Sequence, residues 1–274
     1  AGGHVELTMS HAIGGILVQT AWLSLADLLY RGANLEHAAA SAANIVQATL
    51  LVVLLGLIVL AAHTPNVTVW AVHPATPIVL AVYLLGLRVV DKARTGPMWQ
   101  PRATSDTRTD EPQADSEGHS LGRLWGEFAA LAVTVALAGL VLERASESIV
   151  ARAGIAESVV GGLLATAATS LPELVTTVSA VRRGALTLAV GGIIGGNAYD
   201  SLFFAISDFA YREGSIYHRA TPPILAMLAI AIVMSAVLVM GMIRRERHGI
   251  MNIGFESFVV LVLYAGAVAL LLAG

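Results

Sequence analysis

The stretch Thr169-Ser170-Leu171-Pro172-Glu173 lies within an apolar run long enough to cross a membrane. Proline lacks a backbone N–H and clashes with the residue four positions earlier, so Pro172 predicts a broken helix with freed carbonyls around residues 166–168. A carboxylate within a membrane span indicates a functional site, commonly for an ion or proton. Hydroxyls, bare carbonyls and the Glu173 carboxylate are the oxygen ligands that hard cations prefer. The stretch therefore predicts a cation site on a broken transmembrane helix.

Composition places the whole chain in the membrane. Of its 274 residues 56% are hydrophobic and 13% are charged, whereas soluble proteins average about 25% charged residues. We therefore predict an all-α, multi-pass membrane protein whose partners are the lipid bilayer and inorganic cations. The absence of cysteine excludes disulfides and thiolate metal sites. No basic patch supports nucleic-acid binding, and neither a catalytic residue nor a bound cofactor is expected.

Eight apolar segments are long enough to span a bilayer. A polar stretch from Asp91 to Ser120, rich in Pro, Thr and charged residues, cannot bury a core and predicts a flexible linker. The chain thus divides into a first half (1–90), a linker (91–122) and a second half (123–274). The expected spans are 5–30, 37–62, 67–90, 123–143, 154–181, 186–210, 221–243 and 253–273.

Basic residues predict the orientation of these spans. With the spans placed as above, twelve of the 16 lysines and arginines fall on one side, together with the linker, and four fall on the other. Cytoplasmic loops carry the excess of Lys and Arg. The linker is therefore expected in the cytoplasm and residue 1 outside, in a plasma or inner membrane.

An internal repeat appears when the chain is shifted by 181 residues. Residues 3–31 then align without gaps with residues 184–212, with eight identities that include glycines and charged residues. Four expected spans separate the copies, so the two helices should run in opposite directions. Inverted repeats around broken helices are typical of secondary transporters with a site near the midplane. The identical pairs are Gly3/Gly184, Leu7/Leu188, Ile13/Ile194, Gly14/Gly195, Gly15/Gly196, Asp27/Asp208, Tyr30/Tyr211 and Arg31/Arg212.

The second copy follows the Pro172 helix, whereas the first copy stands at the beginning of the chain. We therefore expect about two further spans upstream of Ala1, which would complete the site with a partner for Glu173. Glu173 and Asp200 flank a tight turn near residues 182–188 and are expected at similar depth. Gln19 occupies the position of Asp200 in the first copy, which predicts an asymmetric site with fewer fixed charges on that side.

Other polar residues have competing interpretations. The glycines of residues 191–196 favour close helix packing, which could also let Asn197 and Asp200 reach the broken helix. Asp27 and Asp208 each precede an arginine by four residues, which favours an ion pair on the helix surface over a proton relay. His11 could titrate near neutral pH, but a histidine satisfied by helix packing is the favoured interpretation.

Two segments resemble an alpha-repeat of the calcium/cation antiporter superfamily, in its sodium/calcium exchanger branch. They are residues 162–174, which contain Thr169-Ser170-Leu171-Pro172-Glu173, and the run Gly191-Gly192-Ile193-Ile194-Gly195-Gly196-Asn197-Ala198-Tyr199-Asp200. The resemblance implies two inverted halves of five spans each, the second repeat covering about 154–212. It further implies that Glu173 and Asp200 ligate the cations, that the Thr169 and Ser170 hydroxyls contribute, and that the Thr166 carbonyl binds sodium.

Na⁺/Ca²⁺ exchange by alternating access is the function that these features predict. A proton-coupled Ca²⁺ exchanger is the alternative, with Glu173, Asp200 or His11 titrating. An intramembrane aspartyl protease is a remote alternative because Tyr199-Asp200 matches half of that signature, while the second half is absent from the chain.

Overall fold

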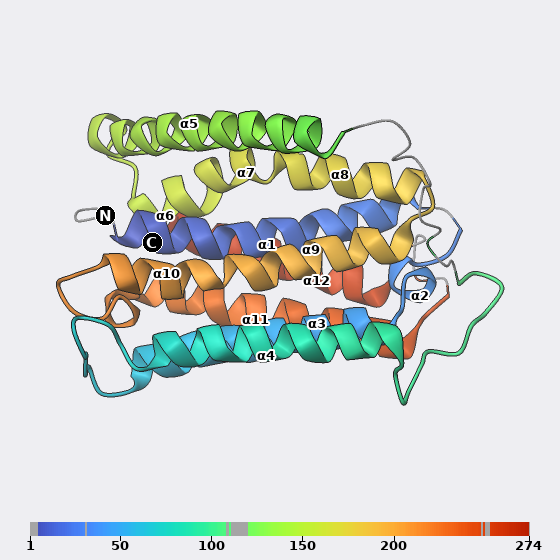
Figure 1. Ribbon diagram of the computed structural model, residues 1–274. Helices are drawn as coiled ribbons and strands as arrows, with labels where there is room; N and C mark the ends of the chain where they lie inside the picture. The colour runs from blue at the N-terminus through green and yellow to red at the C-terminus, as the bar shows by residue number, and fades with distance from the viewer. Residues whose placement is uncertain are drawn as a thin grey trace.

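The computed structural model describes residues 5–30, 32–107, 110, 120–247, 249 and 253–273. Long helices lie side by side in a bundle, and one end carries the short helix α2 and the described part of the linker (Figure 1). We call this the linker end; α1 begins and α12 ends at the opposite end. The long helices are α1 (Val5–Leu29), α3 (Ala42–His63), α4 (Ala75–Thr95), α5 (Leu121–Ala153), α8 (Leu171–Arg182), α9 (Leu186–Asp200), α11 (Pro222–Arg244) and α12 (Phe255–Ala273).

Short segments complete the described chain. The π-helical turn η1 precedes Thr166, and α10 continues the direction of α9 after a break at Ser201. The short segments are α2 (Leu35–Ala38), α6 (Glu157–Val159), η1 (Val160–Ala165), α7 (Thr166–Thr169), α10 (Leu202–Ala210) and the 3₁₀ turn η2 (Tyr217–Arg219).

Local sequence explains where several helices begin and end. The Ser41 and Ser120 side chains accept hydrogen bonds from the N–H groups of Asn44 and Arg123, which caps α3 and α5. Gly154 ends α5 in the left-handed region, at φ 66°, where glycine carries no steric penalty. Gly184, at φ 79°, closes the tight α8–α9 turn that the sequence predicts near residues 182–188.

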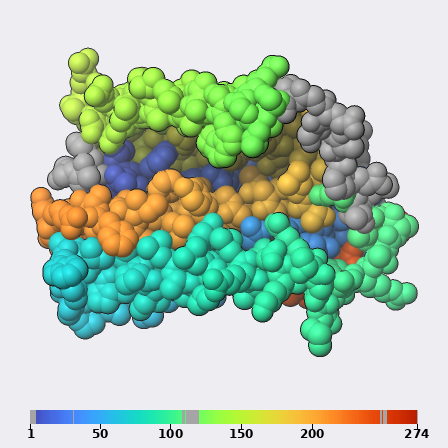
Figure 2. Space-filling view, viewed as in Figure 1, coloured from blue at the N-terminus to red at the C-terminus, as the bar shows by residue number. Residues whose placement is uncertain are grey.

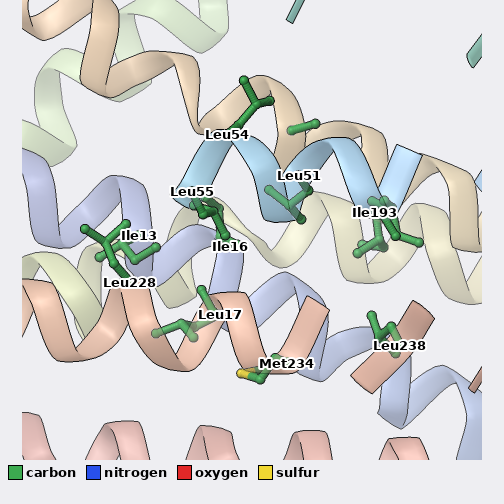
Figure 3. Packing of buried hydrophobic residues seen from close by; sticks show 14 of the residues in the cluster. Ile13, Ile16, Leu17, Leu51, Leu54, Leu55, Ile193, Leu228, Met234 and Leu238 are labelled. Carbon is green, nitrogen blue, oxygen red and sulfur yellow. The ribbon is translucent and has the colours of Figure 1, made fainter. Parts of the chain in front are cut away.

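Aliphatic side chains from α1, α3, α9 and α11 form the centre of the bundle (Figure 3). Ile13 and Ile16 of α1 and Leu54 of α3 are each fully buried or nearly so. Helix α1 is buried around most of its circumference, so polar side chains in its middle, such as Gln19, face other helices rather than lipid. This placement makes α1 the axis around which the candidate site is built.

The number of spans is smaller than the eight expected. Six helices of the described chain are long and apolar enough to cross a membrane, and the bent pair of residues 157–169 and 171–182 raises this to seven. The segment expected over 67–90 forms α4 from Ala75 to Thr95, with Arg88, Asp91, Lys92 and Arg94 in its last two turns. These charges place α4 below the apolarity of a typical span. The chain is an all-α, integral multi-pass membrane protein.

Part of the linker is anchored to the bundle. Asp110 accepts hydrogen bonds from the N–H groups of Thr187 (3.2 Å) and Leu188 (2.6 Å) at the start of α9. A carboxylate is favourable at this position because the N-terminus of a helix carries partial positive charge. Helix α5, by contrast, lies along one edge with its most apolar stretch unburied, and the surface is hollowed between it and the α9–α10 region (Figure 2).

Candidate cation site

The predicted helix break is present at Ser170. The axes of the segments on its two sides differ by 42°, and Pro172 lies in the first turn of the second segment. Since Pro172 has no N–H, the Ala168 carbonyl loses its usual donor four residues later. The Thr166 carbonyl, however, accepts the N–H of Ser170 at 3.0 Å. The break therefore frees fewer carbonyls than the sequence alone suggested.

Helices α1 and α9 meet in the middle of the bundle through their polar side chains. The Gln19 amide donates to Oδ2 of Asp200 at 3.1 Å. Three residues before Asp200 on α9, the Asn197 amide donates to Oγ1 of Thr20 at 2.9 Å and to the carbonyl of Ile16 at 3.4 Å. Three of the sequence-predicted residues thus come together on two neighbouring helices.

Glu173 lies on the second segment of the broken helix, α8, which packs beside α9. Its side chain is half-buried, and its charge is within electrostatic range of Asp200. Among the described residues, three buried oxygens of the group have no hydrogen-bond donor: Glu173 Oε2, Gln19 Oε1 and Asn197 Oδ1. Donor-free oxygens in a shared region are the ligands that Na⁺ and Ca²⁺ prefer.

The hydroxyls of Thr166 and Thr169 bond to their own helix. Thr166 Oγ1 donates to the Gly161 carbonyl at 2.7 Å, and Thr169 Oγ1 donates to the Ala165 carbonyl at 3.1 Å. A hydroxyl that donates its proton keeps its lone pairs for another partner. Ser170 is buried at the bend itself. Ligand roles for Thr166, Thr169 and Ser170 remain predictions that this geometry permits.

His11 lies where α1 meets the first part of the broken span. Its Nδ1 is 3.4 Å from Thr166 Oγ1, and the Thr166 hydroxyl also contacts the His11 carbonyl at 3.2 Å. The histidine therefore packs at the junction of two helices, in line with the favoured interpretation.

The glycines of α9 pack mainly on α3 rather than on the broken helix. A Cβ at Gly191 would lie 2.8 Å from Oδ1 of Asn44, and one at Gly195 would overlap the Gln47 side chain. Asn44 also donates to the Thr187 carbonyl at 3.2 Å. Sequence reasoning missed Asn44 and Gln47, although two amides three residues apart in an apolar span were a usable signal.

A cavity of about 650 Å³ adjoins this part of α9 at the linker end. Its wall includes Asn44, Gly191 and Gly192, together with Arg94 and Asp110 from α4 and the linker. The cavity is therefore bounded by the same face of α9 that packs on α3. Polar residues of the linker and the glycines that precede Asp200 therefore line the same cavity.

The ion-pair interpretation of Asp27 and Asp208 is wrong for Asp208. Its carboxylate is fully buried and accepts hydrogen bonds from the N–H groups of His73 and Ile216 and from the Thr76 hydroxyl. Arg212 instead lies beyond the end of α10 and donates to the Trp70 carbonyl. Burial of the carboxylate explains the failure, because three donors inside the protein replace both water and the arginine.

Asp27 is likewise buried and accepts from the N–H groups of Leu35 at 2.6 Å and Gly254 at 3.1 Å. Arg31, its expected partner, lies outside the described residues. Both aspartates therefore hold loops to helix ends. Neither one lies on a helix surface.

Comparison with known proteins decides the family. The family model described as sodium/calcium exchanger protein matches residues 123–273, which is more than half of the chain and includes Glu173, Asn197 and Asp200. The chain belongs to the sodium/calcium exchanger protein family. It is therefore a member of a family of cation antiporters rather than of enzymes, which removes the protease alternative.

A relative in this family is the sodium/calcium exchanger MaX1 of Methanosarcina acetivorans. It is 33% identical over 117 residues, which cover 40% of this chain and 32% of that protein. The aligned part thus spans about a third of the relative's length. No solved structure matches the chain.

Proposed function

We propose that this member of the sodium/calcium exchanger family exchanges Na⁺ for Ca²⁺ at the Gln19–Glu173–Asp200 group. The observation that carries the proposal is the Gln19–Asp200 hydrogen bond between mid-span residues, with donor-free oxygens of Glu173 and Gln19 beside it. Two carboxylates balance the charge of one Ca²⁺ or attract more than one Na⁺. Because both ions need the same oxygens, one leaves as the other binds.

An inverted repeat is the second part of the proposal. Gln19 and Asp200 are themselves 181 residues apart, the shift that aligns the repeat. Other hydrogen bonds, far from this pair, also occur twice, with both partners shifted by 181 residues. This correspondence supports two halves of equivalent fold that face opposite ways. The matching bonds are Asp27–Leu35 with Asp208–Ile216, Asp27–Gly254 with Asp208–His73, and His37–Arg245 with His218–Thr64.

Such symmetry supports alternating access, since two halves of similar energy can exchange their arrangements around a fixed site. The site itself departs from this symmetry, because the Gln19 amide of the first repeat faces the Asp200 carboxylate of the second repeat. We infer that this asymmetry keeps the net charge low enough for an ion to leave. Further fixed charges at the site would bind the cation more tightly and so slow its release.

The decisive experiment is calcium uptake into vesicles that contain the full-length protein, driven by an outward sodium gradient. Glu173→Gln and Asp200→Asn should each reduce uptake to the level of protein-free vesicles, because each removes a carboxylate from the shared site. Glu213→Gln, the same chemical change as Glu173→Gln in an exposed loop, should leave uptake unchanged. Unaltered uptake by both site variants would refute the assignment.

The same vesicles test the proton-coupled alternative. Calcium flux that follows an imposed pH gradient without sodium would show that H⁺, rather than Na⁺, is the counter-ion. Flux that requires sodium at every pH gradient supports the proposal.

A further inference from the structure

A second group of acidic residues lies at the linker end, outside the candidate cation site. Asp27 near the end of α1, Glu36 in α2 and Glu256 at the start of α12 are 0%, 0% and 1% exposed. Three buried carboxyl groups in one place are costly unless each is neutralised or well hydrogen-bonded. Each therefore needs a partner that can be identified.

Asp27 has its partners. Its two oxygens accept the N–H groups of Leu35 and Gly254, and Ser257 also interacts with it. Backbone and hydroxyl donors stabilise the ionised form of a buried carboxylate. Asp27 is therefore the best hydrogen-bonded carboxyl group of the three.

Glu36 and Glu256 have fewer donors. Glu36 Oε1 accepts a long bond from the Ser257 hydroxyl, at 3.3 Å, while Glu36 Oε2 and both oxygens of Glu256 have no donor among the described residues. The two carboxyl groups are nevertheless close enough to interact, since Glu36 is bonded to Ser257, the residue that follows Glu256, and each carboxyl group acts on the other. Two ionised carboxylates cannot bond to each other, because neither has a proton to donate.

The surrounding charges do not neutralise the pair. The described basic side chains nearby bond elsewhere: Arg244 to Glu246, Arg245 to carbonyls and to the Thr107 hydroxyl, Arg247 to Asp106, and the His37 ring to the Arg245 carbonyl and Thr104. In the described part of the chain, the other groups that act on the pair through their charge are acidic, namely Asp27 and Glu246. Burial, with Asp27 and Glu256 adding repulsion, raises the pKa of Glu36 well above its ordinary value.

The other end of the molecule provides an internal comparison. The residues 181 positions from Glu36 and Glu256 are Tyr217 and Ala75. There the Tyr217 hydroxyl contacts Thr76 at 3.0 Å, and Thr76 in turn donates to Asp208. The same aspartate-centred arrangement is thus built at that end without an acidic pair. The fold itself does not require Glu36 and Glu256.

Backbone packing holds the Glu256 side chain in place. A Cβ at Gly241 of α11 would lie 2.7 Å from Glu256 Cδ, and one at Gly254 would overlap its carboxyl oxygen. The carboxyl group therefore cannot swing away to relieve repulsion from Glu36. Any change in its charge acts on α2, α11 and α12 together.

We propose that Glu36 and Glu256 form a proton-binding site, in which one shared proton resides on Glu36 and is donated to the Glu256 carboxylate. When the proton leaves to water, Glu36 and Glu256 become two adjacent buried anions beside Asp27. Their repulsion then drives α2 and the start of α12 apart. The occupancy of this site makes the packing of the linker end depend on pH.

Infrared difference spectroscopy of the full-length protein in nanodiscs tests the site directly. Wild type at neutral pH should show the carbonyl stretch of a protonated glutamic acid, equivalent to one proton per chain, and Glu36→Gln should lose it. Glu256→Gln should keep the band at a shifted frequency, because the acceptor changes. Glu213→Gln, in an exposed loop, should leave it unchanged.

Two results would overturn the proposal. A wild-type spectrum without a protonated glutamic acid band does so without any variant. Loss of the band on adding Na⁺ or Ca²⁺ at constant pH does so as well, because the pair would then be a cation site.

Thermal unfolding gives an independent readout. An unfolded glutamate is ionised above about pH 4.3, so the folded protein holds one more proton than the unfolded chain up to the raised pKa of Glu36. Stability therefore falls as pH rises through this window and levels off once the folded protein also loses its proton. In the double variant Glu36→Gln/Glu256→Gln, Tm should decrease over this pH range by at most half as much as in wild type. An unchanged pH profile would contradict the site even if exchange activity were absent.

Discussion

At the residue scale, the site is defined by an amide that faces a carboxylate. Gln19 donates to Asp200 across the α1–α9 contact, while its own oxygen has no donor among the described residues. One side chain can therefore orient Asp200 with its nitrogen and offer its oxygen to a cation. Such a double role needs an amide, and neither a carboxylate nor an apolar residue supplies it.

Gln19→Leu tests this role. A hydrogen bond to a charged group contributes about 1.5–3 kcal/mol, so its loss together with a ligand oxygen should weaken the apparent calcium affinity roughly tenfold or more. Concentration-dependent calcium uptake by the reconstituted protein measures the change. Gln100→Leu, at an exposed glutamine of the linker, serves as the control and should keep the wild-type affinity.

At the element scale, contact between α1 and the first part of the broken span depends on glycine. A Cβ at Gly14 would lie 2.6 Å from the Gly162 carbonyl oxygen and 2.9 Å from the Gly162 Cα. Both are backbone atoms, which cannot move aside as a flexible side chain can. Gly14 thus allows α1 to approach the backbone of η1, the segment that precedes the helix break.

Gly14→Ala should therefore destabilise the bundle by about 1–3 kcal/mol, the usual cost of overpacking. Gly56→Ala is the matched control, since Gly56 also lies within a long helix and a Cβ there meets no atom within 4 Å. Thermal unfolding in the same detergent compares the two variants. Equal melting temperatures for wild type and Gly14→Ala would contradict the close approach.

At the scale of the whole molecule, the linker and the basic residues define one end of the bundle. The distribution of Lys and Arg predicts that this end faces the cytoplasm, and Asp110 ties the linker to the start of α9 there. The opposite end carries the loop between α3 and α4, in which Asn66 is exposed. Orientation can be tested directly because the chain has no cysteine.

Single cysteines provide the test. Asn66→Cys should react with a membrane-impermeant maleimide in intact cells, whereas Gln100→Cys should react only after the membrane is permeabilised. Both positions are exposed, so a difference between them reports sidedness rather than burial. The reverse pattern would invert the proposed topology.

The sequence alone determined the membrane class and the helix break, and it predicts that Glu173 and Asp200 share a site. These follow from local chemistry: apolar length, the missing N–H of Pro172, and the tight turn at Gly184 that brings two successive helices together. By length and composition six or seven candidate spans are found in the described chain instead of eight, because the charges near the end of α4 lie within a helix that is long enough but less apolar. The length of α4 was therefore easier to predict from the sequence than its depth in the membrane.

Only the tertiary structure decided which polar groups satisfy one another. It turned Asp208 from an expected surface ion pair into a buried acceptor of three hydrogen bonds. It also brought Glu36 against Glu256, 220 residues further along the chain, where no short-range pattern links them. The physical reason is that helix periodicity limits which residues share a face, whereas the fate of a buried charge depends on donors that come from distant segments.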